Sequence, residues 1–586
     1  MKNNEPTGTS GRLPWEQPTA QQSAPPYAQG QEPTQPLGQT SEWQRQAAAP
    51  LGNQHYWEPP TVPPVLTAPP QPQKPKGISR RAVLIGAGAG AVGIGALGAG
   101  LGFFLSNRAS SSGPANVFAS DAQQVAHLIR RAGLGPWPND FGDYINAGVS
   151  GTIDRLLNYS SIPNSDLDNL INSLNYDFSR PEDLIHWFTI RMLYSKHPLE
   201  EKMTMFWHGV LVSGLDKGGK AMPPYLAQQN QVLRQNCLGR FDDLIHAIST
   251  DPAMLVYLDG ARSTGRLPNE NYARELMELF TLGVVNPQGQ PNYTQDDVHQ
   301  GALALTGWAI EGGKGVYLPH RHYNGTVTYL GHTGNLGLDD VVRIVCAHPA
   351  APYHIAWRMW SFFAYPVNPN DSVLQPLVDA YNHNNHSIHA MVEAMLRSPD
   401  FISDKAYRQR LKSPVEFLAG AIRNLGIQTT LQRNALRGLY TALGQVPFDP
   451  PNVSGWDGDK DSRAWLSTQT WMTRVNLINT LVVVATGGAT GGKRQATQSA
   501  SSTTNSPVQQ TINQRGISSA KDLTDYYVAA MLDNNITSDR RSALYDAINQ
   551  SGKGPTLTLA GGATVPAVSV RQMLYLLMTM PEYHLN

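Results

Sequence analysis

The chain has 586 residues, long enough for a large buried core, and its 45 basic side chains are balanced by 45 acidic ones. This balance excludes the global positive field by which many nucleic-acid-binding proteins attract their ligand. With only two cysteines, Cys237 and Cys346, the chain has no disulfide scaffold and no zinc site built from CxxC pairs; one disulfide bridge or two buried thiols both stay open.

Residues 1–78 form a compositionally distinct tail. They hold 16 of the 43 prolines, many glutamines and few aliphatic side chains. A segment of this composition buries too little apolar surface to offset the entropy that it loses on ordering. We therefore expect the tail to be disordered.

The next segment, residues 79–106, is predicted to be a targeting signal or membrane anchor. Arg80 and Arg81 precede a run without any charged side chain, residues 82–105. About 20 apolar residues are enough for a helix to cross a bilayer. An arginine pair ahead of an apolar run resembles a twin-arginine export signal. No clean small-x-small cleavage site follows, so we expect the protein to be exported, or anchored in the membrane through 82–105 and facing outside the cytoplasm.

The same run also contains G-x-G-x-x-G, at Gly88, Gly90 and Gly93, which is the fingerprint of a dinucleotide-binding turn. Such a site needs a following strand and an acidic side chain about 20 positions later to hold the ribose. Here the first acid after the run is Asp121, and a mostly polar loop precedes it. The sequence therefore predicts no dinucleotide cofactor.

After a linker at 107–120, apolar side chains recur at helical spacing throughout residues 121–485. The alternation typical of strands is rare, and its best candidate is one short hairpin within 315–331. A Gly/Ser/Thr/Gln tract at 486–515 indicates a loop, and further helices in 516–586 complete the domain. The predicted fold is mainly α: a large multi-helix globular domain with few short strands, preceded by a disordered tail and one apolar signal or anchor helix.

Several stretches together resemble one family, the large bacterial proteins grouped as domain of unknown function 1800. The stretches that carry the resemblance are HLIRRAGLG (127–135), EKMTMFWHG (201–209), DPAMLVYLDG (251–260), NENYARELMELFTLG (269–283), YTQDDV with ALTGW (293–308), GHTGN (331–335), KSPVEFL (412–418), GQVPFDPPNVSGWDG (444–458) and WLS (465–467). The resemblance implies a bacterial, commonly exported, mostly helical protein whose activity is not established. It supplies no catalytic mechanism.

The chain departs from the family pattern at two places. The family commonly has an arginine where Leu303 stands, just before the ALTGW stretch. It also tends to have His-Asp and then a lysine ahead of the GHTGN stretch, where this chain has His322, Tyr323 and Asn324 and no lysine before Leu330. If those residues form part of a site in the family, the site is altered here.

The stretch at 269–283 is predicted to be a helix with one buried apolar stripe. Its polar side chains lie about one turn apart and are Glu270, Asn271, Arg274, Glu275 and Glu278. One interpretation is a solvated face with ion pairs that contribute about 0.2–0.5 kcal/mol each. The other is a cleft-facing carboxylate pair, kept ionised by the neighbouring arginine and able to perform acid–base chemistry or to bind a divalent cation.

We predict that one polar cleft in the helical core is lined by six side chains of the matched stretches: His208, Asp259, Asn271, Arg274, Glu275 and Glu278. The short loop between Asp259 and the glutamate helix keeps these two segments close in space. His208 is included on the resemblance alone. A histidine between aromatic residues is otherwise a core residue bonded to the backbone, a general base or a metal ligand.

Two further groups of side chains are candidate metal ligands. They are the loop histidines His320, His322 and His332, and the alternating carboxylates Asp457, Asp459 and Asp461. The histidines have no acidic neighbour, and the carboxylates lack the glycine and glutamate that an EF-hand loop requires. Trp456 and Trp465 would either line a sugar platform or pack in the core. The cofactor therefore stays unknown, with a divalent cation as one candidate.

Two functions are consistent with these patterns. The first is an exported or membrane-anchored helical protein whose polar cleft binds a ligand or performs hydrolysis. The alternative is a non-catalytic scaffold that binds another exported protein. The expected partner is another exported protein or a cell-envelope polymer, and not nucleic acid. Convergence of His208 and Glu275 in a cleft favours the first function, whereas an exposed apolar patch without a titratable pocket favours the second.

Replacing both Arg80 and Arg81 with lysine tests the predicted address. We expect the double variant to stay inside the cell, because the twin-arginine route reads the arginine pair. Cell fractionation followed by immunoblotting measures the distribution, with the unchanged chain as the control. Normal export of the double variant would leave only an ordinary anchor helix.

Overall fold

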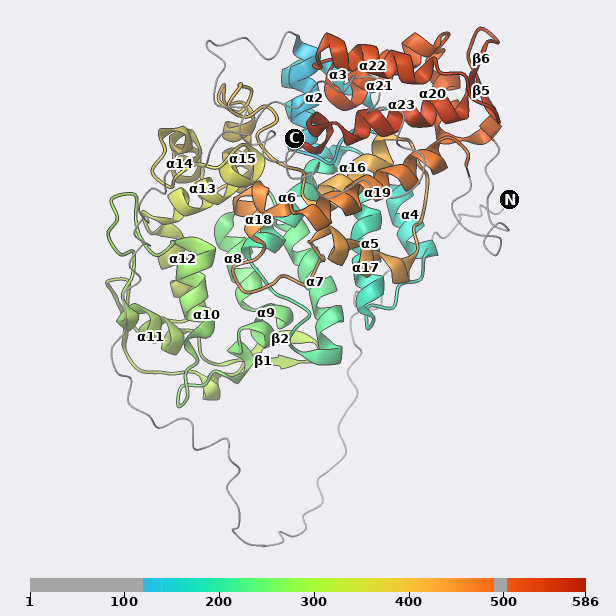
Figure 1. Ribbon diagram of the computed structural model, residues 1–586. Helices are drawn as coiled ribbons and strands as arrows, with labels where there is room; N and C mark the ends of the chain where they lie inside the picture. The colour runs from blue at the N-terminus through green and yellow to red at the C-terminus, as the bar shows by residue number, and fades with distance from the viewer. Residues whose placement is uncertain (1–119, 139, 489–502) are drawn as a thin grey trace, which may run out of the picture. The chain divides into compact units, whose positions relative to one another are not determined.

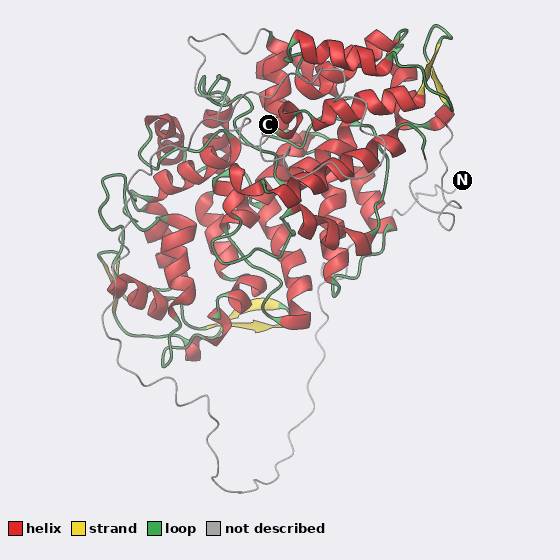
Figure 2. Cartoon of the chain, viewed as in Figure 1, coloured by secondary structure: helices red, strands yellow, loops and turns green. Residues whose placement is uncertain are grey.

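The computed structural model describes residues 120–138, 140–488 and 503–586, all within one compact unit, Val92–Asn586. Helices dominate this part of the chain, and the strands form only small hairpins (Figure 2). The predicted mainly α class is therefore confirmed.

The predicted disordered tail, 1–78, and the predicted signal or anchor segment, 79–106, lie outside the described residues, as does most of the linker at 107–120. Among the helices that are described, none is long and apolar enough to cross a membrane.

The first part of the described chain is a succession of helices that begins at Asp121. Their bounds are α2 (Asp121–Arg131), α3 (Phe141–Leu157), α4 (Ser165–Ser173), α5 (Pro181–Tyr194), α6 (Pro198–Val210), α7 (Met222–Gln235), α8 (Phe241–Ser249), α9 (Pro252–Tyr257), α10 (Glu270–Glu275), the π-helix η5 (Leu276–Thr281) and α11 (Gln295–Ala304). Proline at the first turn opens α5, α6 and α9, where its missing N–H leaves no helical hydrogen bond unmade.

The second part continues in the same way. Its helices are α12 (Leu338–Ala347), α13 (Ala351–Phe363), α14 (Gln375–His383), α15 (Ile388–Leu396), α16 (Pro414–Asn424), α17 (Arg433–Leu443), α18 (Asp457–Lys460), α19 (Thr468–Ala485), α20 (Pro507–Arg515), α21 (Ala520–Leu532), α22 (Ser538–Ile548) and α23 (Ala567–Thr579). Short 3-10 turns are η2 (Tyr159–Ser161), η3 (Gly219–Ala221), η4 (Gly260–Arg262), η6 (Pro319–Arg321), η7 (Ser372–Leu374), η8 (Ser462–Trp465), η9 (Thr503–Asn505) and η10 (Pro581–His584). A capping box between Ser413 and Glu416 fixes the start of α16.

The strands correct the prediction of one hairpin within 315–331. β1 (Trp308–Glu311) pairs antiparallel with β2 (Lys314–Tyr317), and β3 (Val327–Tyr329) pairs with β4 (His332–Gly334). The predicted range therefore contains one strand from each of two hairpins, because each strand pairs across its own tight turn. A third hairpin joins β5 (Thr556–Thr558) to β6 (Thr564–Pro566).

The predicted loop at 486–515 contains a helix at its C-terminal end. α20 begins where the Ser506 hydroxyl accepts a hydrogen bond from the backbone N–H of Gln509, with Pro507 in the first turn. Val508 and Ile512, one turn apart, are both fully buried. Two apolar anchors and a good cap are enough to fix a helix in a composition that otherwise indicates a loop.

The two ends of the described chain pack together. Figure 1 shows α2 and α3 beside α21 and α22. Arg130 in α2 forms a buried ion pair with Asp533 at the end of α21, in which Nη2 lies 2.5 Å from Oδ2. Tyr407 donates a hydrogen bond of 3.0 Å to the same carboxylate. One large hydrophobic cluster runs from Leu128 to Tyr583 and joins both halves of the chain.

α6 carries two neighbouring charges into the core, and each has a partner on another helix. The Glu201 carboxylate lies 2.9 Å from Nε of Arg191 in α5 and 2.9 Å from Nη2 of Arg234 in α7. Lys202 pairs with Glu416 in α16, and both side chains are buried. Despite burial, Lys202 and then Arg410 lower the pKa of Glu416 to about 2. These pairs fix α6 against three other helices.

Both cysteines are buried free thiols. Cys237 lies 3.4 Å from the hydroxyl of Tyr159, and burial raises the pKa of Cys237 to about 12. Burial also raises the pKa of Cys346 well above its usual value. Of the two alternatives left open by the sequence, the structure has the buried thiols.

Replacing Glu416 with Gln tests the dependence of the fold on the Lys202 pair. We expect the free energy of unfolding to fall by about 3–5 kcal/mol, because Lys202 then remains buried without a counter-charge. Urea denaturation measures the loss. The control is Glu393→Gln, which removes an exposed pair with Arg397 and changes stability by about 0.5 kcal/mol or less.

The same contribution depends on pH in a defined direction. Since the folded pKa of Glu416, about 2, lies below its ordinary value of 4.5, the Glu416 side of the ion pair stabilises the fold fully above about pH 4.5 and loses this effect as the pH falls toward 2. The difference in the free energy of unfolding between the unchanged chain and Glu416→Gln should therefore become smaller as the pH falls from about 4.5 to 2. At the alkaline end, burial lowers the pKa of Lys202 to about 8, so the pair also weakens as the pH rises through that value. Equal stability of Glu416→Gln and the control at pH 7 would contradict the role of the pair.

Candidate functional site

The glutamate helix, which consists of α10 and η5 (residues 270–281), changes its winding halfway along. α10 ends at Glu275, and the chain continues without a break as the π-helix η5. Tyr272, Leu276, Met277 and Phe280 form its buried face. A π-turn takes in an additional residue, is rare, and occurs frequently at functional sites. The π-turn is therefore one indication that a binding site lies beside this stretch.

The first turn of α10 has the solvated, ion-paired face that was the first of the two interpretations of this stretch. Arg274 Nη2 lies 3.1 Å from Glu270 Oε2, and both side chains are about one-third exposed. Arg274 also donates to the side-chain oxygen of Gln295, and His299 lies 3.3 Å from Glu270. Arg274 thus has Glu270 as its ion-pair partner.

Asp259 and Asn271 meet at the edge of the same region. Asp259 adopts a left-handed backbone conformation with a φ of 59°. Its Oδ2 atom lies 3.1 Å from Nζ of Lys217 and 3.5 Å from Nδ2 of Asn271. The predicted closeness of the two segments is therefore present, and it brings in a lysine that sequence reasoning did not include.

Glu275 and Glu278 are half-buried rather than fully in solvent. Burial raises the pKa of Glu275, the negative charge of Glu278 raises it further, and Arg274 acts in the opposite direction. Glu278 accepts a hydrogen bond of 2.9 Å from the hydroxyl of Tyr293. The pair thus consists of one carboxyl group that protonates more easily and one that is held by a phenol.

His208 lies in the core. Its Nε2 accepts a hydrogen bond of 3.2 Å from the backbone N–H of Phe448, and its ring packs against Phe448 and Trp456. Burial lowers the pKa of His208 to about 4, so the ring is neutral at pH 7. Within the described residues no hydrogen bond or ion pair joins His208 to Glu275 or Glu278. Its surroundings match the backbone-bonded core histidine that the sequence left as an alternative.

A cavity of about 270 Å³ opens between the glutamate helix and α13. Glu278 is the only one of the six predicted residues in its described wall. The basic side chains of the wall are His354 and Arg358 from α13 and Lys460 from α18, and Asn286 and Tyr353 add an amide and a hydroxyl group. The rest of the wall is mainly apolar and includes Leu279, Leu282, Val284, Val285, Trp357 and Pro369.

Arg358 connects this cavity to α6. It is buried, and its Nη2 donates a hydrogen bond of 3.0 Å to the carbonyl of Gly209, the residue after His208. Burial lowers the pKa of Arg358 to about 10, against the effect of Asp459. Burial raises the pKa of Asp459 to about 7, and also lowers the pKa of Lys460, with Arg358 adding to the effect. The cavity therefore carries more positive than negative charge.

His354 forms the neutral part of the wall. Its Nε2 donates a hydrogen bond of 2.9 Å to the carbonyl of Leu279 in the π-helix, since a carbonyl can only accept. Burial lowers the pKa of His354 to about 4. Gly283, with a φ of +75°, lets the chain pass beside Nδ1, because a Cβ there would lie 2.9 Å from it. This contact ties α13 to the glutamate helix.

Two glycines, Gly209 and Gly455, allow a close approach between the end of α6 and the segment that leads into α18, and Figure 1 shows α18 beside α6. A Cβ on Gly209 would lie 2.5 Å from the Asp459 carboxylate, and a Cβ on Gly455 would lie 2.6 Å from the Gly209 carbonyl. Gly455 also has a φ of +81°. Arg358 therefore lies where matched stretches meet: it donates a hydrogen bond to Gly209 of one, shares the cavity wall with Glu278 of another, and is acted on by Asp459, which directly follows a third.

The family model described as protein of unknown function (DUF1800) matches residues 127–585. The chain belongs to the DUF1800 family. No curated protein and no solved structure matches the chain. The two departures of this DUF1800 chain from the pattern, at Leu303 and at 322–324, lie outside the cavity wall.

Sequence reasoning missed Arg358, Lys460 and His354 of this DUF1800 cavity. The signal for Arg358 was present: one arginine in the apolar run HIAWRMWSFF, with apolar residues on every side. A charged side chain in such a run is buried only with a partner or a function. Its connection to Glu278 was not accessible, because 80 positions separate the two residues.

The remaining candidate metal ligands, the loop histidines and the three alternating aspartates, do not come together around a common point in the part of the chain that the structure describes. The described residues contain no group of three or more His, Cys, Asp or Glu side chains arranged to hold a metal ion. Asp457, Asp459 and Asp461 do not form a calcium loop, because Asp457–Lys460 is helical, Asp459 is buried and Asp461 pairs with Arg463. Trp456 and Trp465 are buried, as the core-packing alternative predicted.

Replacing Gly209 with Ala tests the contact between α6 and α18. We expect a loss of about 1–3 kcal/mol in the free energy of unfolding, because the new methyl group displaces Asp459 from a tight fit. The matched control is Gly438→Ala in α17, where a Cβ meets nothing within 4 Å. Alanine there should stabilise by about 0.5–1 kcal/mol. Urea denaturation separates the two variants, and a neutral Gly209→Ala would disprove the close approach.

Proposed function

We propose that the protein binds a small acidic ligand, or the acidic end of a larger one, in the cavity between η5 and α13. The observation that carries this proposal is Arg358. This buried guanidinium lines the cavity, donates Nη2 to a carbonyl, and has no carboxylate within 4.0 Å among the described residues. Asp459 acts on Arg358 from beyond ion-pair distance, and burial favours the neutral form of Asp459. A buried cation compensated in this incomplete way is unfavourable, and a ligand carboxylate or phosphate would supply the missing charge.

Lys460 and Glu278 define the ligand further. Lys460 adds a second, half-buried positive charge to the wall. Glu278 is an acceptor, so it favours a ligand that carries a hydroxyl or amino donor near its acidic group. A cavity of about 270 Å³ suits a molecule of modest size. A small hydroxy or amino carboxylate combines these features.

Hydrolysis is the second candidate, favoured by the raised pKa of Glu275. Burial and the charge of Glu278 both hold a proton on this carboxyl group more firmly. A carboxyl group whose pKa is raised can act as a general acid or base, and Glu275 precedes the wall residue Glu278 by three positions on the same helix. In this candidate Glu278 and Lys460 orient the substrate and Glu275 transfers the proton.

The proposed place of action is outside the cytoplasm, after export or at the membrane. This rests on Arg80, Arg81 and the uncharged run 82–105. The scaffold alternative would use exposed apolar side chains; Val284 and Val285, about half exposed, line the same cavity. An exported protein or a cell-envelope polymer that presents an acidic group would therefore meet the same surface.

Thermal unfolding of the full-length chain with L-malate, L-glutamate and succinate tests the proposal. We expect malate or glutamate to raise the Tm in a saturable way, and succinate, which lacks the donor, to do so less. At a ligand concentration of about 100 Kd the stabilisation is about 2.7 kcal/mol. Lys460→Met should abolish the shift, whereas Lys314→Met on the exposed β2 strand should keep it.

The outcome that would overturn the binding proposal is also defined. If none of the three acids gives a saturable shift, or if Lys460→Met retains the full shift, the cavity does not bind acids through these cations.

A further inference from the structure

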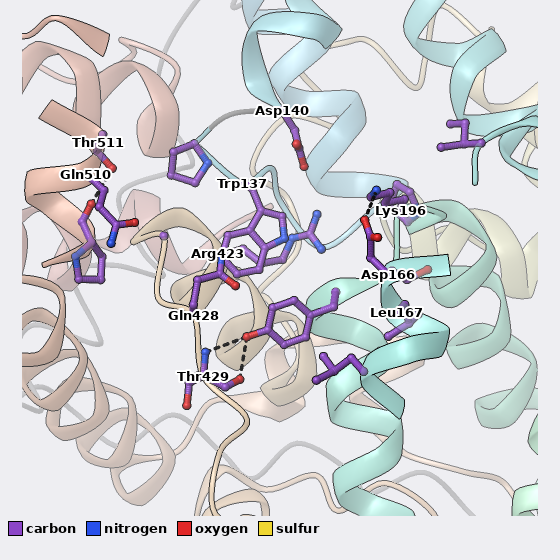
Figure 3. A pocket seen from close by; sticks show the side chains of 18 of the residues that line it. Trp137, Asp140, Asp166, Leu167, Lys196, Arg423, Gln428, Thr429, Gln510 and Thr511 are labelled. Carbon is purple, nitrogen blue, oxygen red and sulfur yellow. Dashed lines mark hydrogen bonds and ion pairs between the residues drawn. The ribbon is translucent and has the colours of Figure 1, made fainter. Parts of the chain in front are cut away.

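A second pocket, much larger than the cavity at Arg358, lies between segments from both ends of the described chain. Its volume is about 960 Å³. In Figure 3, Gln510 and Thr511 of α20 stand on one side, Asp166 and Lys196 on the other, and Trp137 lies between them. Neither the family resemblance nor the proposed acid-binding site uses this pocket.

The floor of the pocket is aromatic and firmly held. Trp137 stacks on Tyr194, with ring centroids 5.6 Å apart and an interplanar angle of 21°. Trp137 Nε1 donates to the carbonyl of Leu193 at 3.2 Å, and the Tyr194 hydroxyl exchanges hydrogen bonds of 2.7 and 2.8 Å with the backbone of Thr429. These contacts fix the rings before any ligand arrives, so little ordering entropy is lost on binding.

Three basic side chains, Arg155, Lys196 and Arg423, line the pocket together with two carboxyl groups, Asp140 and Asp166. Arg423 is buried and donates to the carbonyls of Gly135 and Leu193 at 2.7 and 2.8 Å. Arg423 and Arg155 both act on the Asp140 carboxyl group, and Lys196 pairs with Asp166 at 2.7 Å. Positive and negative groups thus nearly balance in the wall, which leaves little net positive charge for an acidic polymer.

What the walls do offer is hydrogen bonding without net charge. Gln428, Thr430, Gln510 and Gln514 are exposed amides and hydroxyls on the rim, and such groups both donate and accept. Figure 3 shows Asp140 with its carboxyl group directed into the space beside Trp137. This half-buried carboxyl group has no ion-pair partner within 4.0 Å among the described residues.

We propose that this pocket binds a neutral oligosaccharide segment of a glycan. Sugar hydroxyls both donate and accept, as the amide and hydroxyl rim does, and a pair of hydroxyls can donate to one carboxylate such as Asp140. Trp137, which is partly exposed in the wall, offers apolar surface to the C–H groups of a sugar. A volume of about 960 Å³ exceeds what one sugar needs, so several linked units fit.

A peptide suits this pocket less well. Strand addition needs an exposed sheet edge, and no described strand lines the pocket. A docked amphipathic helix needs a continuous apolar groove, whereas amides, hydroxyls and charged groups interrupt this one. A proline-rich peptide on the aromatic floor is the competing ligand that the experiment must distinguish.

Isothermal titration calorimetry with the full-length chain tests the proposal. The probes are chitotetraose, maltotetraose and mannotetraose, with polygalacturonate and a proline-rich decapeptide as competitors of other classes. We expect at least one neutral tetrasaccharide to bind with a saturable isotherm. Asp140→Asn and Gln428→Ala should each weaken its binding about tenfold or more. Asp539→Asn and Gln550→Ala, exposed residues of similar type outside the pocket, should leave the Kd unchanged.

Several results would overturn the proposal: no binding of any of the three tetrasaccharides, binding that Asp140→Asn and Gln428→Ala leave unchanged, or binding of the acidic polymer or the peptide in their place. Because the pocket variants leave Arg358 and Lys460 intact, their response to malate and glutamate reports on the acid-binding site separately.

Discussion

The buried pair between Lys202 and Glu416 is the constraint on which much of the remaining structure depends. Two charged side chains in an apolar core are tolerated only when each satisfies the other, so α6 and α16 must meet in one register. Glu201, the residue before Lys202, then pairs with Arg191 and Arg234 and fixes α5 and α7 as well. With α6 held in this way, its C-terminal end at Gly209 receives both Arg358 and the α18 segment.

This arrangement explains why the stretches shared with the family are dense in charges and glycines. Most of their polar residues act in the fold: Glu201, Lys202 and Glu416 form ion pairs, and Gly209 and Gly455 permit a close approach. The cavity arises where such stretches meet. The cationic groups of the cavity, Arg358 and Lys460, belong to α13 and α18. Gly209, which holds Arg358 in place, lies in a different stretch, at the end of α6.

The sequence predicted the helical class because apolar periodicity is a local property that burial then preserves. It also predicted the closeness of Asp259 and Asn271, since only a short loop separates them. It did not predict the two hairpins around 315–331, because alternation indicates each short strand but not the neighbour with which that strand pairs across its turn. The cavity and the large pocket were inaccessible for a related reason: Trp137 and Gln510 share a wall although more than 370 positions separate them.

The change from α10 to η5 makes the length of this segment matter for the site. A π-turn takes in one residue more than an α-turn, so deleting one residue within 276–281 would let the segment return to regular winding with little rotation of the chain beyond it. Five residues would then have to fill the places of six. One of the side chains would be lost either from the core, where Leu276, Met277 and Phe280 pack, or from the cavity wall, where Glu278 and Leu279 lie. The additional residue of the π-turn is therefore what allows this short segment to serve the core and the cavity at once.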